Sequence, residues 1–377
     1  MFGCRPAVRP LLPDPAVIGL LMAHPGAHEK GTPMRRLILR SLGSVIAGVA
    51  LLCGTLTAAP AAGAADVTCS EHRVPISLGA VGTHMVSGTL CGPSSGVGSD
   101  TVQILVPGST YDHTYWDFPI SGYSYARYAA QHGQTTFALD RFNTGNSDRL
   151  PSAVVTVLAD AATVHQVAGK LRRGEIGGKK FRKVITVGHS LGSIIVLQEA
   201  AQYRDVDGLM LTGFTHTPSV KFMADLATGK VLQPAPMVSP DLADQPLGDF
   251  GANCASRERN FYAPGNYDPA VVAEDCRHGT VITAGELATF PLPTFGPHSE
   301  LVTAPVMLAM GTKDTVFFCG LKPCHDMATL RAAERHRFPQ AESIDFFLLP
   351  NGGHDLNLAL NRTEFFQAAV EWVDQVS

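Results

Sequence analysis

Short apolar runs alternate with stretches of helical hydrophobic spacing along most of the chain. The runs are of strand length and lie at residues 101–106, 135–139, 184–187, 206–212, 306–310 and 344–349. The stretches with helical spacing lie at residues 122–132, 152–172, 191–203 and 360–375. Strands that alternate with helices are usually joined by parallel crossovers, and short, mainly apolar strands are typical of a sheet covered on both faces. The pattern predicts an α/β fold with a mostly parallel central sheet and helices on both faces.

One long segment, residues 214–300, interrupts the alternation. It is rich in Pro, Gly and aromatic residues, as in PAPMVSPDLADQPLGDFG at 234–251. A loop of this length without secondary structure is improbable in a compact domain, whereas long insertions are often active-site lids. We therefore expect a lid or cap, inserted into a core of residues 66–213 and 301–377. The alternative is a second folded domain unrelated to the site.

The residues before this core have the features of an export signal. Residues 34–40, MRRLILR, are positively charged, residues 42–56 are mainly apolar, and small residues lead to a cleavage site near Ala64 or Ala65. This order is that of a secretory signal peptide, and the apolar stretch is short for a membrane anchor. The paired arginines also fit twin-arginine export. We expect residues 34–65 to be removed and the mature protein to be secreted.

Residues 1–33 precede that signal, are rich in Pro and lack hydrophobic periodicity. Because a signal peptide begins its chain, we expect translation to start at Met34 and this extension to be absent from the mature protein.

The residues that remain after cleavage are acidic. Residues 1–65 hold six of the 29 Lys and Arg residues and two of the 33 Asp and Glu residues, which leaves 23 basic and 31 acidic side chains and a net charge of −8. A chain of this charge has no basic field, so nucleic acid is not an expected partner. Stable membrane insertion after signal cleavage is not expected either.

Six of the eight cysteines lie after residue 65. An even number in an exported chain indicates disulfides, although six cysteines allow 15 pairings. Proximity along the chain favours the pairs Cys69–Cys91, Cys254–Cys276 and Cys319–Cys324. The first pair would tie the ends of two strands that the sequence predicts within residues 66–92. Paired C-x-x-C spacing is missing, so a metal site is not expected.

The stretch VITVGHSLGSIIV places Gly188-His189-Ser190-Leu191-Gly192 between a strand and a helix. A G-x-S-x-G element in this context indicates a nucleophile elbow, a strained turn that exposes a serine. The residues two before and two after Ser190 must be small, and glycine meets that need. The N–H of Leu191, at the helix N-terminus, would stabilise negative charge on the group attacked. A phosphate-binding turn is the alternative, but its glycine patterns are missing.

This element and its context resemble the α/β-hydrolase superfamily, in particular secreted, cap-bearing serine hydrolases of the lipase and esterase type, over residues 100–377. In that family the acid and then the histidine follow the nucleophile. Asp314, after a late strand, matches the acid, because groups at the carboxyl ends of strands face the site. His354, in the loop PNGGHD, matches the histidine, and the runners-up are His216, His298 and His325. The resemblance implies a Ser190–His354–Asp314 triad that needs no cofactor or metal.

The loop after the strand at 101–106 should supply the second oxyanion donor. The family often has His-Gly there, and this chain has Pro107-Gly108-Ser109-Thr110, so the N–H of Ser109, or else of Thr110, is the candidate. The side chains that follow could line an acyl pocket together with His189, or pack the core: Tyr111, Tyr115 and Trp116. His189 itself is expected to pack beside the turn without transferring a proton. Asp140-Arg141 with Gly145-Asn146-Ser147 resembles a loop of the superfamily that is usually architectural.

The resemblance implies a secreted carboxylic ester hydrolase that acts through an acyl-enzyme on a small-molecule or lipid-like substrate. The same triad cleaves amides, so a cap-bearing peptidase or amidase is the alternative. A non-catalytic binding protein on this fold is a further alternative, but the complete set of triad candidates argues against it. Likeness of fold does not name the substrate.

Overall fold

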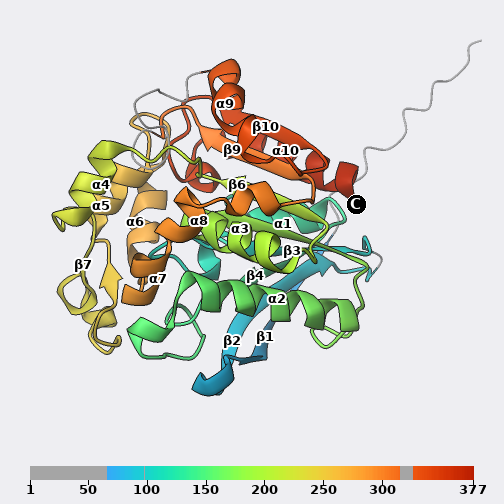
Figure 1. Ribbon diagram of the computed structural model, residues 1–377, viewed down its shortest axis with the longest axis horizontal. Helices are drawn as coiled ribbons and strands as arrows, with labels where there is room; N and C mark the ends of the chain where they lie inside the picture. The colour runs from blue at the N-terminus through green and yellow to red at the C-terminus, as the bar shows by residue number, and fades with distance from the viewer. Residues whose placement is uncertain (1–65, 97, 315–325) are drawn as a thin grey trace, which may run out of the picture. The chain divides into compact units, whose positions relative to one another are not determined.

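The computed structural model describes residues 66–96, 98–314 and 326–377 (Figure 1). The predicted signal peptide, the upstream extension, the Cys319–Cys324 pair and His325 lie outside these ranges. The expectations made for them stay predictions.

A mixed sheet of eight strands forms the centre of the described residues (Figure 1). Its strands are β1 Val67–Ser77, β2 Thr83–Pro93, β3 Thr101–Val106, β4 Thr135–Leu139, β5 Lys183–His189, β6 Gly208–Thr212, β9 Val306–Gly311 and β10 Ile344–Leu349. Their order across the sheet is β1-β2-β4-β3-β5-β6-β9-β10. β2 is antiparallel to β1 and β4, and the other neighbours are parallel. The predicted α/β architecture is confirmed, and the carboxyl ends of the parallel strands share one edge.

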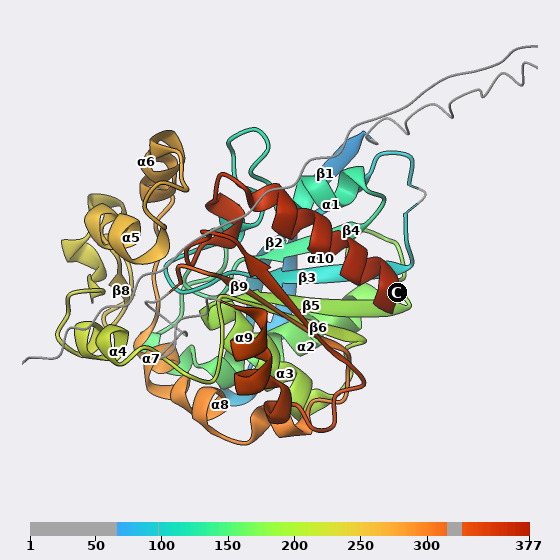
Figure 2. The same cartoon turned by 90° about the horizontal axis from the view of Figure 1, so that it is seen from above.

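Helices cover both faces of the sheet. Those of the core are α1 Tyr125–Gln131, α2 Val157–Arg173, α3 Leu191–Tyr203, α9 Met327–Glu334 and α10 Arg362–Val376. α1 and α10 pack together on one face, and α2 and α3 pack together on the other (Figure 2). Capping explains where they begin, because the Thr156 hydroxyl accepts from the Ala159 N–H and starts α2. All of them except α9 were predicted from hydrophobic spacing.

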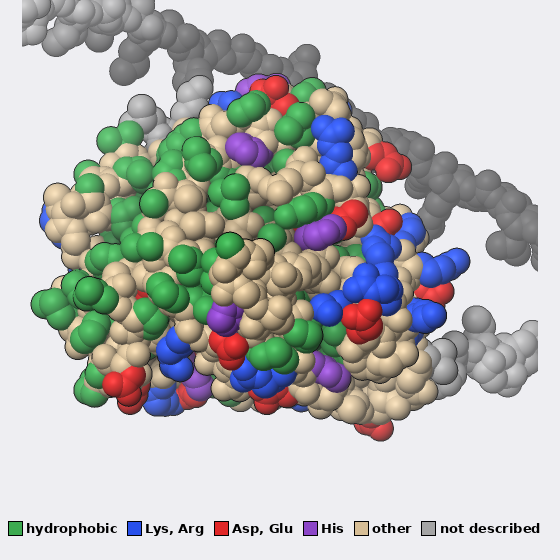
Figure 3. All heavy atoms as spheres, turned by 60° about the horizontal axis from the view of Figure 1, so that its bottom comes forward, with side chains coloured by type: hydrophobic (Ala, Val, Ile, Leu, Met, Phe, Trp, Pro, Cys, Tyr) green, Lys and Arg blue, Asp and Glu red, His purple; other side chains and the backbone are tan. Residues whose placement is uncertain are grey.

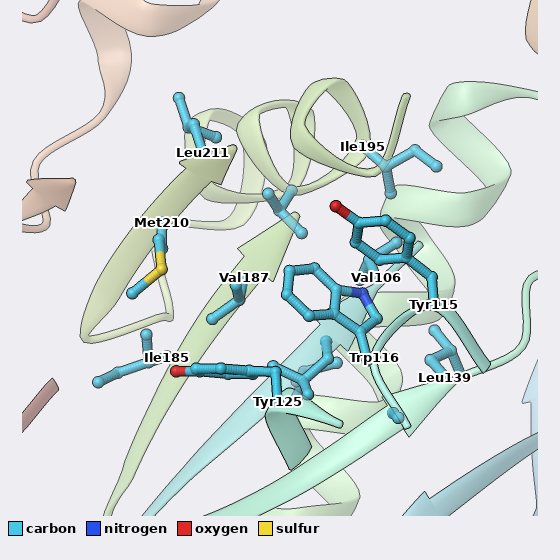
Figure 4. Packing of buried hydrophobic residues seen from close by; sticks show 14 of the residues in the cluster. Val106, Tyr115, Trp116, Tyr125, Leu139, Ile185, Val187, Ile195, Met210 and Leu211 are labelled. Atoms are coloured by element: carbon cyan, nitrogen blue, oxygen red, sulfur yellow. The ribbon is translucent and has the colours of Figure 1, made fainter. Parts of the chain in front are cut away.

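Apolar side chains fill the space between sheet and helices. Ile104 of β3 and Leu308 of β9 are fully buried. Figure 4 shows Trp116 and Tyr125 beside Val187 of β5, and the two aromatic ring centres are 5.7 Å apart. This packing fixes β5, the strand that leads into the G-x-S-x-G turn.

The segment 214–300, here called the insertion, is folded. It contains α4 Val220–Ala227, β7 Gln233–Pro234, β8 Phe250–Gly251, α5 Cys254–Phe261, α6 Pro269–Arg277, α7 Ala284–Thr289 and α8 Pro291–Phe295. β7 and β8 pair as a small antiparallel sheet. α7 packs against α2, and α8 packs against α3, so the last part of the insertion covers the core (Figure 1).

Two predicted disulfides are confirmed within the described residues. Cys69 and Cys91 face each other across β1 and β2, and Cys254 and Cys276 join α5 to α6. Each pair is separated by 22 residues in the chain. Within the described ranges, no helix has the length and apolar character needed to cross a membrane.

Candidate active site

Ser190 occupies a strained turn between β5 and α3. Its backbone has φ 53° and ψ −116°, a conformation that non-glycine residues rarely adopt, and its N–H donates to Thr212 O at 2.9 Å. A Cβ at Gly188 would collide with the backbone of Gly192, and a Cβ at Gly192 would collide with Val106 O. Both glycines are therefore required by close backbone approach, as the sequence indicated.

Backbone N–H groups converge near Ser190 from two elements. Leu191 is the first residue of α3, so its N–H has no intrahelical acceptor. On the facing loop, a Cβ at Gly108 would lie 3.1 Å from Ser190 Cβ. The Thr110 N–H donates to Val281 O at 3.3 Å, whereas no hydrogen bond among the described residues uses the Ser109 N–H. The geometry thus favours Ser109 over Thr110 as the second donor.

Asp314 and His354 meet at the ends of β9 and β10. His354 Nδ1 is hydrogen-bonded to Asp314 Oδ2 at 2.8 Å, and both side chains are buried. Because an ionised carboxylate only accepts, this bond places the proton on Nδ1 and the imidazole lone pair on Nε2. Their two loops are joined, since the Lys313 N–H donates to Gly352 O at 2.8 Å.

The three predicted triad residues reach the same edge of the sheet. Ser190 follows β5, Asp314 follows β9 and His354 follows β10, and these strands are parallel members of one sheet. A Cβ at Gly213, after β6, would lie 3.0 Å from the rings of both His354 and His189. The fold therefore gathers the groups that the sequence placed far apart.

His189 packs beneath the site. Its ring is stacked on Tyr115 with centres 4.2 Å apart, and it lies 4.8 Å from the His354 ring. Nε2 is 3.1 Å from Asp355 Oδ1, and Nδ1 is 3.1 Å from Thr212 Oγ1. Burial lowers the pKa of His189 to about 4 despite Asp355, so the ring is neutral at pH 7. This environment fits the expectation that His189 does not transfer protons.

An apolar cavity opens beside Ser190. Its free space is about 610 Å³, with the solvent at its mouth included. Ser109, Ser190, Leu191 and Ile194 line its core side, and the insertion supplies the rest: Pro218, Phe222, Met223, Leu226, Val231, Leu232, Phe261, Ile282, Leu287, Phe290 and Thr294. Thr294 is the one residue with a polar side chain among those from the insertion.

The geometry does not support the expectation that His189 and the aromatic residues after Thr110 line the acyl pocket. Tyr111, Tyr115, Trp116 and His189 are at most 3% exposed and are not among the residues that line the cavity. The Tyr111 hydroxyl donates to Asp355 Oδ2 at 2.6 Å, which draws the side chain inward. Core packing, the alternative stated from the sequence, is the role these residues have.

The sequence model of the Alpha/beta hydrolase family matches residues 103–368. The chain belongs to this family. Solved structures of similar fold include a thermophilic esterase from Thermogutta terrifontis, with 18% identity over 81% of this chain and 99% of that chain and a TM-score of 0.56. A monoacylglycerol lipase from Paleococcus ferrophilus has 16% identity over 82% and 100% of the two chains and a TM-score of 0.51.

A bromoperoxidase from Bacillus anthracis has 14% identity over 81% of this α/β-hydrolase and 100% of its own chain, with a TM-score of 0.54. At these identities the likeness concerns the fold alone. No protein with a curated description matches the sequence.

His216 and His298, the two other described candidates for the catalytic histidine of this α/β-hydrolase, have surroundings unlike those of His354. His216 is buried with Nδ1 2.6 Å from Glu334 Oε2, and His298 begins a short 3-10 helix that packs on α3. His354, by contrast, is paired with Asp314, and its ring lies beside Gly213 and 4.8 Å from the ring of His189, the residue before Ser190. The geometry favours His354 over His216 and His298.

The Asp140-Arg141 loop is a scaffold of the site. Asp140 accepts from the His113 and Asn146 N–H groups, at 2.8 and 3.0 Å. Arg141 is 1% exposed, pairs with Glu286 of α7 and donates to Gly108 O at 3.0 Å. The architectural role expected from the sequence fits these contacts.

Sequence reasoning missed the insertion residues that shape the site. Phe222, Met223 and Leu226 of α4 recur at helical spacing, a signal that identifies an apolar face without naming its partner. Arg257, three residues after Cys254, carried no such signal, yet it is 1% exposed and bonds to the loop of Thr110.

Proposed function

We propose that this chain is a serine hydrolase that cleaves carboxylic esters through an acyl-enzyme. The observation that carries the proposal is the Asp314–His354 hydrogen bond at the strand edge where Ser190 stands on its strained turn. Family membership and the esterase and lipase folds among similar structures support it.

In the proposed reaction, Ser190 Oγ attacks the ester carbonyl carbon while His354 Nε2 takes the hydroxyl proton. Asp314 keeps the Nδ1 tautomer and stabilises the imidazolium. The N–H groups of Leu191 and Ser109 receive the oxyanion. The protonated His354 then gives its proton to the leaving alcohol as the ester C–O bond breaks and the acyl-enzyme forms. His354 next deprotonates a water that attacks the acyl carbonyl carbon, and it returns this proton to Ser190 Oγ as the acid is released.

We further propose that the substrate carries an apolar group beside its carbonyl and that the insertion acts as a cap. The cavity next to Ser190 is lined almost entirely by apolar side chains, most of them from the insertion. The outer face over the insertion is also rich in hydrophobic side chains (Figure 3). The exposed large apolar residues of the insertion are Val220, Met237, Leu247, Leu292 and Phe295.

Export is part of the same proposal. The order of charged, apolar and small residues in 34–65 and the two disulfides fit a secreted protein.

The test is covalent labelling combined with substrate profiling. A fluorophosphonate probe should label the wild-type chain, and Ser190→Ala should abolish labelling and lower ester turnover by about 10⁴-fold or more. The matched control is Ser121→Ala, which changes an exposed serine outside the site and should keep both fluorophosphonate labelling and ester turnover. p-Nitrophenyl esters of graded acyl length, assayed beside aminoacyl anilides, separate an esterase from an amidase. Full ester turnover by folded Ser190→Ala would refute the mechanism.

A further inference from the structure

A buried ion pair joins two helices of the insertion. Arg257 of α5 and Asp275 of α6 are each 1% exposed. Arg257 Nε donates to Asp275 Oδ2 at 3.1 Å, and Nη2 donates to Oδ1 at 2.6 Å. This fork geometry fixes the orientation of the guanidinium as well as its distance. The disulfide lies beside the pair, because Cys254 is one turn before Arg257 and Cys276 follows Asp275.

The remaining nitrogen of Arg257 reaches the loop that carries the proposed oxyanion donor. Nη1 donates to Thr110 O at 3.0 Å and to Thr110 Oγ1 at 2.9 Å, and the guanidinium carbon lies 4.2 Å from the centre of the Tyr111 ring. Thr110 directly follows Ser109. A shift of Thr110 would therefore move the Ser109 N–H.

Thr110 needs such support. Its φ of 62° is left-handed, which a β-branched residue adopts only where its surroundings hold it. Its N–H donates to Val281 O at 3.3 Å, and its carbonyl accepts from the Thr280 N–H at 2.9 Å as well as from Arg257. All three polar atoms of Thr110 thus bond to residues of the insertion.

The same helix also contacts the histidine loop. The Asp355 N–H donates to Phe261 O at 3.1 Å, at the end of α5, and the Tyr111 hydroxyl donates to Asp355 Oδ2 at 2.6 Å. A Cβ at Gly353 would lie 2.7 Å from Phe261 O. α5 therefore touches both neighbours of His354 in the chain.

We propose that Arg257 is a positioning residue for the oxyanion loop, held in the required orientation by Asp275 and by the Cys254–Cys276 disulfide. The inference rests on the proposed ester hydrolysis, since it concerns how the donors of that reaction are held. Arg257 does not line the cavity. Its removal should slow the chemical step and leave substrate fit nearly unchanged.

The first experiment compares Arg257→Lys and Arg257→Met with Arg259→Lys, an exposed arginine on the same helix that donates only to Lys230 O among the described residues. Both Arg257 variants should lose about 10- to 100-fold in kcat with KM within about twofold, because a misplaced oxyanion donor weakens only the transition state. Inhibition by a trifluoromethyl ketone, whose adduct carries an oxyanion, should weaken by the same factor. Arg259→Lys should behave as wild type.

Three results would overturn the inference. They are full kcat in a folded Arg257→Met variant, a rise in KM at constant kcat, and a loss of kcat that leaves inhibition by the ketone intact. Near-ultraviolet circular dichroism and thermal unfolding establish that the variants are folded.

The second experiment does not depend on the Arg257 variants being stable. Cys254→Ser/Cys276→Ser is compared with Cys69→Ser/Cys91→Ser; both disulfides span 22 residues, so removing either changes loop-closure entropy equally. At a temperature where both variants are folded, opening 254–276 should lower kcat by about tenfold, and opening 69–91 should leave it unchanged. Equal kcat values for the two variants would contradict the inference.

The two proposals fail in different ways. If ester hydrolysis by Ser190 is wrong, the wild-type chain turns over no ester, or folded Ser190→Ala keeps the ester turnover. If only the positioning role is wrong, the wild-type chain is labelled and turns over esters, and the Arg257 variants match it.

Discussion

The central sheet and the insertion differ in how far buried charges hold them in place. The strands β3, β5 and β9 are almost wholly buried and mainly apolar, so the core rests on hydrophobic burial. The insertion also buries apolar side chains against the core, among them Phe261 and Ile282. Its junction adds buried charges, with Arg141 pairing to Glu286 and Arg257 bonding to Thr110. Apolar contacts tolerate changes of partner, whereas a buried charge needs its own partner. The comparison teaches that removing one partner of a junction pair should cost more than a small, shape-conserving apolar change within the sheet.

The largest stability effect is expected where the junction pair is broken. Arg141→Met or Glu286→Gln leaves one buried polar partner uncompensated and should lower the free energy of unfolding by about 3–5 kcal/mol. The double variant should lose less than the sum of the two, which urea unfolding measures. Lys221→Met breaks an exposed pair with Asp225 and is the control; it should leave the melting temperature nearly unchanged. If the single variants are as stable as the wild type, the buried pair at the junction does not contribute as proposed.

Acidification tests the buried core directly beside Ser190. Burial holds the pKa of His189 at about 4, below its ordinary 6.5, so between these values the unfolded chain binds more protons than the folded one. The stabilisation is present above pH 6.5 and is lost as the pH falls towards 4, by roughly 3 kcal/mol for this one group. His189→Gln should flatten this part of the stability profile. An unchanged slope in the variant would assign the acid sensitivity to other groups.

The smallest effect is expected inside the sheet. Ile104→Val removes one methylene from a fully buried position of β3 and should cost about 1 kcal/mol, with kcat unaltered. Thermal unfolding and ester turnover measure both quantities. A loss as large as that of Glu286→Gln would show that the sheet is no more tolerant than the junction.

The core could be predicted because its signals are local. The glycines around Ser190, the strand before Asp314 and the glycines before His354 each mark a turn in a short stretch of sequence. Parallel strands then place the turns at one edge, which brings together residues that periodicity alone cannot pair.

The lining of the cavity and its supports could not be predicted in the same way. Arg257 and Thr110 are 147 residues apart, and no pattern in either neighbourhood refers to the other. From the sequence, the aromatic residues after Thr110 are candidates for lining a pocket. In the structure the Tyr111 hydroxyl donates a hydrogen bond to Asp355, which directs the ring into the core. Which residues line the cavity and which support it depends on how the helices of the insertion pack on the core.

The bonds from Arg257 to Thr110 also bear on how the molecule could be re-engineered. A cap that only covered a finished site could be exchanged between relatives as a cassette to change specificity. Here all three polar atoms of Thr110 depend on the segment that would be exchanged. A graft of residues 214–300 would therefore have to include residues 108–111, because the two segments form one hydrogen-bonded unit.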